Sequence, residues 1–549
     1  MERRQIPKEK KFGLSAILDA LSSKRWVRNL VYISSMVFFF VLVLLPPIAS
    51  ILQKAARLTE IYGIPELLAR ANSAVLWSFV LAFTVSILDL VAAFPLAWYI
   101  VRSRSSLIKA IDTLADIPFL IPTAALGYSA SLFWSQREGI SSLFGAEPLV
   151  APGFLLILLL HFAFSYPVIV RVMVGELLGY REVYEVAAKT LGAQPLTSVR
   201  TVTLPLLKPA LVASFLLAFA RSLSETGATV MVAGSFENGP IFIYNNIGAE
   251  GALVYASSLL IFSSVIVFFL IRLLALRLRF PLRRAWPNFE RTLSGRALVR
   301  SRDLTTIVVF LFFVIVPSLF VALPMVSALG DGTLGEAFGG GSLWSDFWSS
   351  MLLSYLIGLI STLANIALGL PAAILIARRR VGSLTPILDA LVNIPIIVPS
   401  IALGVSLRFF WESVGAVSEF WVLVFSHVTI TYTYFVRSMV ASIESITPEM
   451  EEVAATLGAK PFAIFRRITL PLSKYSVFSG AVLVFTRCVG ETGAAKAAAE
   501  TLRTVPVLLV DWIVKGTASP SESALGIGFL IAASFLILLA MRIVVRGEE

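Results

Sequence analysis

The sequence EVAAKTLGAQPLTSVRTVTLP at residues 185–205 is a short polar stretch between strongly apolar segments. A second version, EVAATLGAKPFAIFRRITLP, occupies residues 452–471. In both, an arginine follows the glycine (Gly192 or Gly458) by eight residues, and Leu-Pro follows it by twelve and thirteen. Two unconstrained loops would not be expected to keep this spacing. The repetition therefore indicates that both stretches have the same function.

The composition places these stretches in a membrane protein. Of the 549 residues, 57% are hydrophobic and 14% charged, and the mean hydropathy is +0.86, whereas soluble domains carry about 25% charged residues. The net charge of +11 could suggest a nucleic-acid partner. We expect none, because lysines and arginines concentrate in cytoplasmic loops of membrane proteins. A single cysteine, Cys488, excludes an intrachain disulfide and a cysteine-based metal cage, and we expect no cofactor and no metal.

Apolar runs predict twelve membrane-spanning segments, since a span needs roughly 20 mostly apolar residues. All should be helices, because lipid offers no partner to unpaired backbone groups. The fifth and eleventh are interrupted by charged residues. The predicted spans are 27–51, 74–101, 111–135, 151–175, 207–233, 252–276, 304–329, 349–377, 386–411, 417–440, 474–496 and 521–546.

Basic residues predict the orientation. The N-terminus begins MERRQIPKEKK, and nine arginines lie between Arg272 and Arg302. The positive-inside rule then places both termini, this basic link and the loops 176–206 and 441–473 in the cytoplasm. We expect a multi-pass protein of a prokaryotic plasma (inner) membrane.

The chain contains an internal repeat. Gly192 and Gly458 are 266 residues apart, and upstream the offset becomes 277. The predicted organisation is a cytoplasmic segment 1–26, a first half 27–280 (core 70–275), a linker 281–303 and a second half 304–549 (core 350–546). Two six-span halves of equal orientation, related by an axis along the membrane normal, are typical of transporters; nothing resembles a channel filter. Matched pairs include His161/His427, Tyr166/Tyr432, Arg171/Arg437, Arg200/Arg466, Pro205/Pro471, Arg221/Arg487, Asp112/Asp389, Pro118/Pro395, Pro122/Pro399 and Trp134/Trp411.

The first polar stretch predicts a helix of about two turns that ends at Gly192, where a left-handed residue can close it. A second short helix should follow and lead into span five at Pro205 and Pro209. Ala187, Ala188 and Gly192 give a small, smooth surface that favours docking of a partner. The alternative is an ordinary interfacial helix.

The spacing resembles the cytoplasmic signature loop of binding-protein-dependent ABC importer permeases: Glu-Ala-Ala, three residues, Gly, nine residues, Ile, one residue, Leu-Pro. The second half departs only at Val453, and the first at Val186, where glutamate is expected; Glu185 lies one residue earlier. The resemblance covers about 70–275 and 350–546. It implies that the loops contact an ATPase through Glu185, Ala187, Ala188, Gly192, Leu204, Pro205, Glu452, Ala454, Gly458, Leu470 and Pro471.

The resemblance implies an all-α fold of two tandem six-helix repeats, the type I ABC importer permease fold, working by alternating access. Its partners would be a dimer of ATPase subunits in the cytoplasm, an extracytoplasmic substrate-binding protein and the bilayer. The chain has no G-x-x-x-x-G-K-[ST] sequence with which to hold ATP phosphates. We therefore expect a transport subunit and not an enzyme.

Two acidic residues lie inside predicted spans, in SETGA at 224–228 and GETGA at 490–494. Intramembrane carboxylates are costly and point to function. One interpretation places both segments at the pathway or gate; the other pairs each glutamate with the arginine one turn earlier, Arg221 or Arg487. Similar segments line the path in molybdate, tungstate and sulfate permeases. The candidate pathway residues are Glu225, Thr226, Gly227, Glu491, Thr492 and Gly493.

Other polar residues inside the spans favour structural roles. Asp89 has no counterpart in the second half and predicts a polar contact. His161 and His427 could be pH switches or metal ligands, but no carboxylate or thiol cluster accompanies them, so buried hydrogen bonds are favoured. Arg171 and Arg437 most simply anchor span ends.

The substrate stays open at this level. Fused two-half permeases of this length resemble ferric-iron and thiamine importers, whereas the ETGA segments favour an oxyanion. A rival class, an ion-coupled secondary transporter, would explain twelve spans and intramembrane acids but not two matched cytoplasmic loops. A channel or membrane scaffold is the third class.

Overall fold

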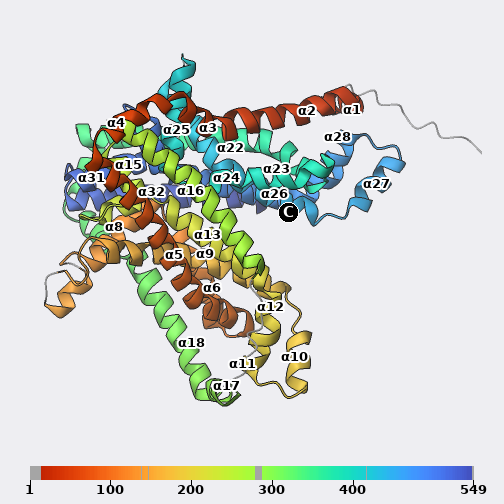
Figure 1. Ribbon diagram of the computed structural model, residues 1–549, viewed down its shortest axis with the longest axis horizontal. Coiled ribbons are helices and arrows are strands. Elements are labelled where there is room, and N and C mark those ends of the chain that lie inside the picture. The colour runs from red at the N-terminus through yellow and green to blue at the C-terminus, as the bar shows by residue number, and fades with distance from the viewer. Residues whose placement is uncertain (1–13, 138, 146–147, 278–286, 416, 547–549) are drawn as a thin grey trace, which may run out of the picture.

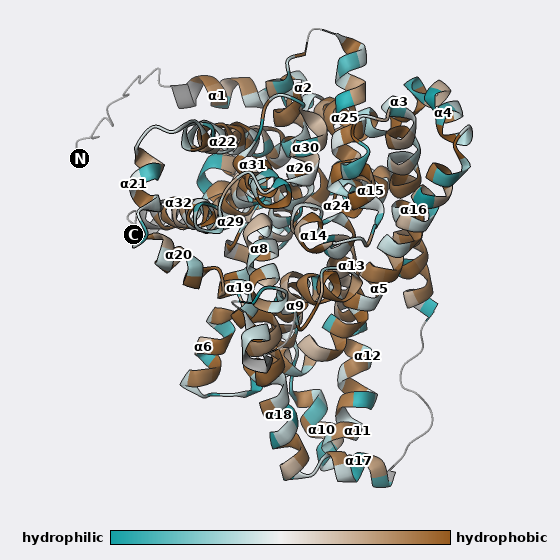
Figure 2. Ribbon diagram, turned by 90° about the vertical axis from the view of Figure 1, so that its left-hand side faces the viewer, coloured by the Kyte–Doolittle hydropathy of each residue, from teal (hydrophilic) through white to brown (hydrophobic). Residues whose placement is uncertain are grey.

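The computed structural model describes residues 14–137, 139–145, 148–277, 287–415 and 417–546, and within these ranges every regular element is a helix. Parts of the expected N-terminal segment 1–26 and linker 281–303, together with 547–549, lie outside them. The helices form one body from which short helices project near α10 and α27 (Figure 1). Hydrophobic residues run along the long helices, and hydrophilic ones gather at places such as α4 (Leu58–Tyr62), α10 (Val183–Thr190) and α25 (Ser400–Val414) (Figure 2).

The core of each half follows one order of helices, so the sequence repeat is also a structural repeat. The first core comprises α5 (Pro65–Arg102), α6 (Ser106–Leu114), α7 (Ile117–Leu120), α8 (Thr123–Trp134), α9 (Phe154–Gly179), α13 (Lys208–Ser224), α14 (Gly227–Val232), α15 (Gly239–Asn245) and α16 (Glu250–Arg277). The second comprises α22 (Ser342–Ala377), α23 (Thr385–Val392), α24 (Ile394–Ile397), α25, α26 (Glu419–Glu444), α29 (Leu470–Val489), α30 (Gly493–Ala498), α31 (Val505–Lys515) and α32 (Pro520–Arg546).

A further span precedes each core and changes helix type midway. The first runs through α2 (Arg25–Phe38), η1 (Phe39–Leu44) and α3 (Leu45–Gln53); the other runs through α18 (Arg296–Phe310), η5 (Leu311–Ile315), α19 (Val316–Leu319) and α20 (Ala322–Ala328). Both η segments are π-helical and stand just before prolines, Pro46 and Pro317. Proline has no amide hydrogen and its ring crowds the carbonyl four residues earlier, so a wider turn is a natural local solution.

Eight helices of the described chain are long and apolar enough to cross a membrane, or eleven if each of three bent pairs counts as one span. The expected span that is not among these eleven is the tenth, 417–440; it is α26, an unbroken helix of 26 residues whose threonines and tyrosines between Thr429 and Tyr434 lower its hydropathy. The third and ninth spans are broken more sharply than proline kinks suggest: the bends are 108° and 103°, next to Pro122 and Pro399.

The two preceding spans are exchanged between the halves. α2 packs against α22 and α3 against α25, whereas α18 packs against α5 and α19 against α8. Equivalent aromatic stacks mark the exchange, with Phe39 on Tyr432 at 5.5 Å and Phe310 on Tyr166 at 5.9 Å between ring centroids. Each half of the fold therefore contains a helix contributed by the other half of the sequence.

Candidate functional site

Both polar loops, residues 176–206 and 441–473, contain the same helix–glycine unit. α10 ends before Gly192 and α27 (Pro448–Thr456) ends before Gly458, with φ of +90° and +88°. In the first loop the N–H of Gly192 donates to the carbonyl of Lys189 and that of Ala193 to the carbonyl of Ala188, both at 3.0 Å. The second loop repeats both bonds at equivalent residues, also at 3.0 Å. This is a Schellman cap, which favours glycine because an L side chain is strained at positive φ.

The chain re-enters the membrane in the same way in both loops. π-helical turns over Val199–Thr203 (η4) and Phe465–Thr469 (η7) precede Leu204-Pro205 and Leu470-Pro471. The prolines take early helical positions in α12 (Leu204–Leu206) and α29, where the missing N–H is tolerated. The matched Leu-Pro pairs therefore set the direction in which α13 and α29 leave the loops.

Glu185 lies inside the protein and does not stand in for the glutamate expected at position 186. It is 3% exposed, and its carboxylate binds Arg102 at 2.7 Å and Lys189 at 2.9 Å. Its equivalent is Glu451, which binds Arg378 at 2.9 Å. Arg102 and Arg378 end or follow the long helices α5 and α22, so each ion pair ties a polar loop to its own half.

Both loops present large apolar side chains to solvent. Leu191 is 89% exposed and Leu457 is 83% exposed, and Val186 and Val453 are also exposed. Sequence reasoning singled out the alanines and glycines and missed these leucines. The signal was available, because a leucine immediately precedes the capping glycine in both loops. Exposed apolar side chains beside a rigid cap are typical of a protein-binding surface.

Each polar loop is also held by a short helix that precedes one of the exchanged spans. The N–H of Leu196 in α11 (Pro195–Ser198) donates to Ser294 Oγ at 3.3 Å, next to α17 (Pro287–Leu293). Correspondingly, the N–H of Phe462 in α28 (Pro461–Ile464) donates to Ser22 Oγ at 3.1 Å, in α1 (Leu14–Ser23). Figure 1 shows α11 beside α17 and α28 beside α1.

The α17 contact has an ionic component. Glu290 accepts a hydrogen bond from the Thr197 hydroxyl and binds Arg200 Nε at 2.7 Å. The hydrogen bond from Thr197, followed by that from Arg200, holds the pKa of Glu290 below its ordinary value, because both favour the carboxylate form. The α1 contact has no such pair in the described residues: the first loop's Arg200 corresponds to Arg466, which stacks over Phe462.

The ETGA segments break both spans that contain them. α13 ends at Ser224 and α14 starts at Gly227; α29 ends at Val489 and α30 starts at Gly493. The predicted continuous spans 207–233 and 474–496 are therefore wrong at these points. Glu225 accepts the Ala228 N–H at 3.4 Å and Glu491 accepts the Ala494 N–H at 3.1 Å. Each carboxylate thus satisfies a backbone donor at the start of the next helix, where negative charge is favoured.

The two segments meet where the halves join. A Cβ on Gly227 would lie 2.5 Å from Thr492 Oγ1, and one on Gly493 would lie 2.7 Å from Thr226 Oγ1. Glycine is required at both positions because nothing larger fits. We call this contact, formed by Glu225–Gly227 with Glu491–Gly493, the gate, a name that refers only to its position between the halves.

Two hydrogen bonds connect the halves beside the gate. Thr123 Oγ1 donates to the carbonyl of Gly490 at 3.4 Å, and Ser400 Oγ donates to the carbonyl of Ser224 at 3.2 Å. Both acceptors are carbonyls freed where α13 and α29 end. The donors begin α8 and α25, directly after the sharp bends, so the bends bring these hydroxyls to the gate.

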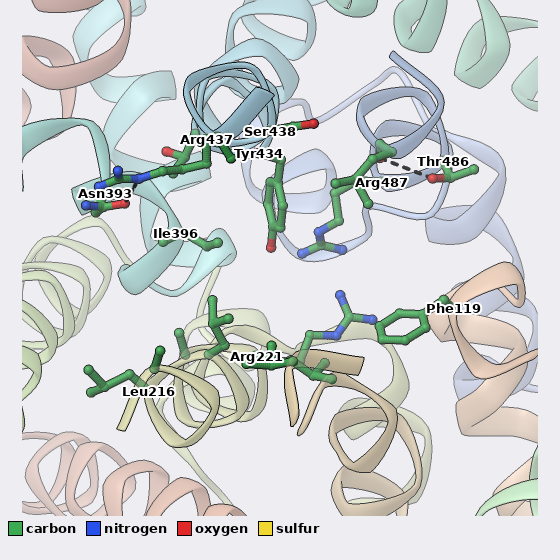
Figure 3. Close-up of a pocket in the computed structure, with 18 of the residues that line it drawn as sticks. Phe119, Leu216, Arg221, Asn393, Ile396, Tyr434, Arg437, Ser438, Thr486 and Arg487 are labelled. Atoms are coloured by element: carbon green, nitrogen blue, oxygen red, sulfur yellow. Dashed lines mark hydrogen bonds between the residues drawn. The ribbon is translucent and has the colours of Figure 1, made fainter. Parts of the chain in front are cut away.

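A cavity of about 1770 Å³ lies between the halves on the polar-loop side of the gate. Along α13 it extends from Lys208 to Arg221, and along α29 from Ser479 to Arg487. Glu225 and Glu491 do not line it. Arg221 and Arg487 reach toward each other across its closed end, with Tyr434 between the two helices (Figure 3). The cavity therefore ends at two guanidinium groups.

The expected arginine–glutamate pairing holds in one half only. Arg487 Nη2 lies 2.8 Å from Glu491 Oε2. Arg221 has no carboxylate oxygen within 4.0 Å in the described part of the chain, and its guanidinium lies 5.5 Å from the Phe164 ring centroid. The two halves thus differ in charge at the point where they face each other.

The histidines are buried and hydrogen-bonded, as predicted. The two ring nitrogens of His161 lie 2.8 Å from Ser222 Oγ and 2.9 Å from Thr229 Oγ1, and His427 Nδ1 lies 2.7 Å from the Leu423 carbonyl. Asp89 accepts a hydrogen bond from Ser165. Among described residues no His/Cys/Asp/Glu group could hold a metal ion.

Arg171 and Arg437 form equivalent ion pairs. Arg171 binds Asp112 and Asp116, both at 2.6 Å, and Arg437 binds Asp389 at 2.6 Å. The ion pairs connect α9 to the end of α6 and α26 to α23, the helices that form the first part of each broken span.

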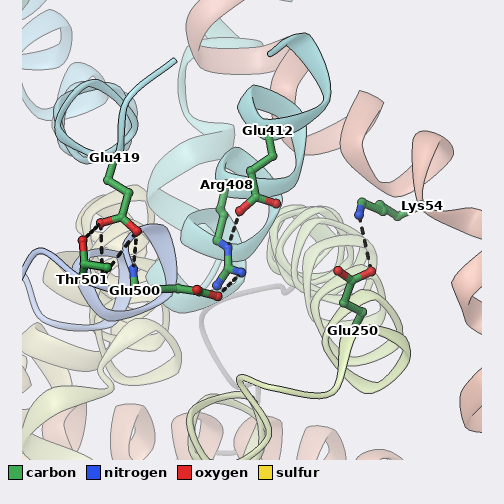
Figure 4. A network of polar contacts seen from close by, with 7 residues as sticks. All are labelled: Lys54, Glu250, Arg408, Glu412, Glu419, Glu500 and Thr501. Atoms are coloured by element: carbon green, nitrogen blue, oxygen red, sulfur yellow. Dashed lines mark hydrogen bonds and ion pairs between the residues drawn. The ribbon is translucent and has the colours of Figure 1, made fainter. Parts of the chain in front are cut away.

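The end of the molecule remote from the polar loops differs between the halves. There Glu419, at the start of α26, accepts the N–H groups of Glu500 and Leu502 at 3.2 and 3.1 Å, and Arg408 binds Glu412 at 2.7 Å as well as Glu500 (Figure 4). The positions that match Glu419 and Glu500 in the first half, 266 residues earlier, are glycines. The contacts of Glu419 and Glu500 therefore have no equivalent at the matching positions of the first half.

Comparisons with known proteins agree with the repeat. The family described as "Binding-protein-dependent transport system inner membrane component" matches twice, at residues 89–280 and 369–547. The sulfate transport system permease protein CysT of Escherichia coli is 30% identical over 265 residues, covering 45% of this chain and 94% of that protein. The molybdenum transport system permease protein ModB of Mycobacterium tuberculosis is 28% identical over 220 residues, covering 36% of this chain and 82% of that protein. A probable transport system permease protein, NifC of Clostridium pasteurianum, is 26% identical over 216 residues, covering 36% and 74%.

Proposed function

The chain belongs to the family of binding-protein-dependent transport system inner membrane components, and we propose that it is the complete transmembrane permease of an ATP-driven importer. The relatives each match over about the length of one half. One fused chain would then supply both halves of the pathway. ATP hydrolysis would take place on separate subunits.

The observation that carries this proposal is the pair of polar loops with exposed leucines. Leu191 and Leu457 stand on rigid Schellman caps, and the ion pairs of Glu185 and Glu451 fasten the loops to α5 and α22. A movement of either loop would therefore be transmitted directly to the helices of the half that contains it. Two equivalent surfaces on one chain fit two copies of an ATPase subunit, which supports a dimeric ATPase on the cytoplasmic side.

The charged contact with the ATPase would be unequal. Glu452 is exposed in the second loop, whereas Val186 occupies the matching position in the first. Glu452 is therefore the candidate for an ion pair with the partner, alongside Ala454. In the first loop, Ala187, Ala188 and Leu191 would make an apolar contact instead.

The gate and cavity support alternating access. The gate is closed and the cavity lies on the polar-loop side, which we take as the cytoplasmic side with both termini. This is the arrangement of an inward-facing transporter. An extracytoplasmic binding protein would dock at the other end, where the Arg408–Glu500 network distinguishes the two halves, so that a two-lobed partner would have one preferred orientation.

We propose a small oxyanion as the substrate, in preference to ferric iron or thiamine. Two relatives are named for molybdenum and sulfate transport. Arginines at the closed end of the cavity would attract an anion and repel a cationic substrate.

The test is reconstitution of the full chain in vesicles with its ATPase and binding protein. We expect uptake of radiolabelled sulfate or molybdate that needs both partners and ATP, with no response to a proton or sodium gradient alone. Uptake driven by an ion gradient without ATP would replace this proposal with the secondary-transporter alternative. Downhill flux without any partner would indicate a channel.

A further inference from the structure

We propose that the closed end of the cavity is an oxyanion-binding site inside the membrane. Arg221 is its main ligand, and Arg487 contributes less because it forms an ion pair with Glu491. This inference rests on the proposed function, because it assigns the substrate a position on its path. It makes the two halves of the permease unequal partners in binding.

The first step is the geometry. Arg221 on α13 and Arg487 on α29 point toward each other across the cavity (Figure 3). Two guanidinium groups that face each other in a low-dielectric region repel, and an anion between them would lower this repulsion. The Nε atom of each is buried and has no hydrogen-bond partner in the described residues, so neither guanidinium is fully satisfied within the protein.

The second step is the charge balance. Glu491 neutralises Arg487 at 2.8 Å. Glu225, the matching residue, is turned toward the Ala228 N–H and does not come within 4.0 Å of Arg221. Arg221 is therefore the guanidinium whose charge is not already compensated by direct contact, and an anion would gain most by binding there.

The third step is the chemistry of the ligand. A guanidinium presents N–H groups in a planar fork that matches two oxygens of a tetrahedral oxyanion. Tyr434 lines the same end of the cavity, and its hydroxyl can donate a further bond. These donors suit sulfate or molybdate, and they offer no carboxylate cage to a ferric ion.

The other charged groups of the cavity do not form a competing site. Arg437 is bound to Asp389 and Asp116 to Arg171, each at 2.6 Å. Lys208 and Arg272 line the polar-loop end, remote along α13 and α16 from the gate. Their positive charges would raise the local anion concentration, but these residues are not part of the proposed binding site.

The experiment measures binding of sodium sulfate and sodium molybdate to the purified full chain in nanodiscs, by ligand-dependent thermal stabilisation and by radiolabelled sulfate. R221Q should weaken binding at least about tenfold, the usual effect of losing a charge-assisted hydrogen bond. R487Q should weaken it clearly less. E491Q should strengthen it, because the carboxylate that competes for Arg487 is removed.

R437Q is the matched control, since it removes one positive charge from the same cavity but at a residue already bound to Asp389. R221K shows whether a folded variant that keeps the charge but loses the fork binds weakly. Equal weakening by R221Q and R437Q would overturn the site, and equal weakening by R221Q and R487Q would overturn the leading role of Arg221. Anion binding without ATP-dependent uptake would count against the proposed function and leave the site standing.

Discussion

The exposed leucines of the polar loops make a quantitative prediction about assembly. Leu191 and Leu457 are 89% and 83% exposed, so replacing them with alanine should change the free energy of unfolding of the permease by less than about 0.5 kcal/mol. If both enter grooves on the ATPase, each truncation removes three carbons from the contact. At about 0.8 kcal/mol per buried carbon, the loss is about 2 kcal/mol per loop.

The double variant L191A/L457A should therefore bind the ATPase dimer with an affinity lowered by about 4 kcal/mol, or roughly a thousandfold. Each single variant should show about half of that free energy, because the loops are distant and independent. The measurement is the dissociation constant of ATPase subunits from permease nanodiscs, with the thermal stability of the permease alone as a check on folding.

L107A is the matched control. Leu107 is 64% exposed and lies in α6, outside both polar loops, so its truncation should leave ATPase affinity within twofold. The reasoning would be refuted if L191A/L457A bound the ATPase within threefold of the parent chain, or if L107A weakened binding as strongly as the double variant.

Three further outcomes are expected. Alanine at Gly192 or Gly458 should strain a cap at positive φ by about 1–2 kcal/mol per loop and lower the uptake per ATP hydrolysed, measured in reconstituted vesicles. Alanine at Gly227 would place its Cβ 2.5 Å from Thr492 Oγ1; anions should leak from loaded vesicles, and G227A/T492G should restore the seal. The lowered pKa of Glu290 means that its contact stabilises the folded loop above the ordinary glutamate pKa of about 4.3 and is lost as the pH falls through the lower folded value. Hydrogen exchange of α17, corrected for intrinsic rates, should rise in that acidic window, and E290Q should show the high exchange already at neutral pH.

The tandem fold was predictable because repeats and hydropathy are properties of the sequence itself. The offset of 266 residues located both loops, both histidines and both ETGA segments, and the double family match confirms the repeat. The capping role of Gly192 followed from local chemistry, because a left-handed residue after a short helix is a strong preference of glycine.

Other features depended on neighbours that the sequence does not specify. Hydropathy predicts that α2 and α18 enter the membrane but does not say which half they contact. The break at the gate depends on tertiary contacts of Gly227 and Gly493. Glu185 was assigned to the partner by the motif, whereas Arg102 holds it inside.

The exchanged first spans have a consequence for synthesis of the chain. Ser35 in α2 donates to the carbonyl of Leu368 at a sequence separation of 333 residues, and Ser22 reaches Phe462 over 440. The helix α2 must therefore leave the ribosome long before most of the second half, against which it packs, has been inserted. Contacts of such range form slowly. Because both halves belong to one chain, the later segment stays attached to α2 and meets it at a high effective concentration. A separate polypeptide would have to reach α2 by diffusion.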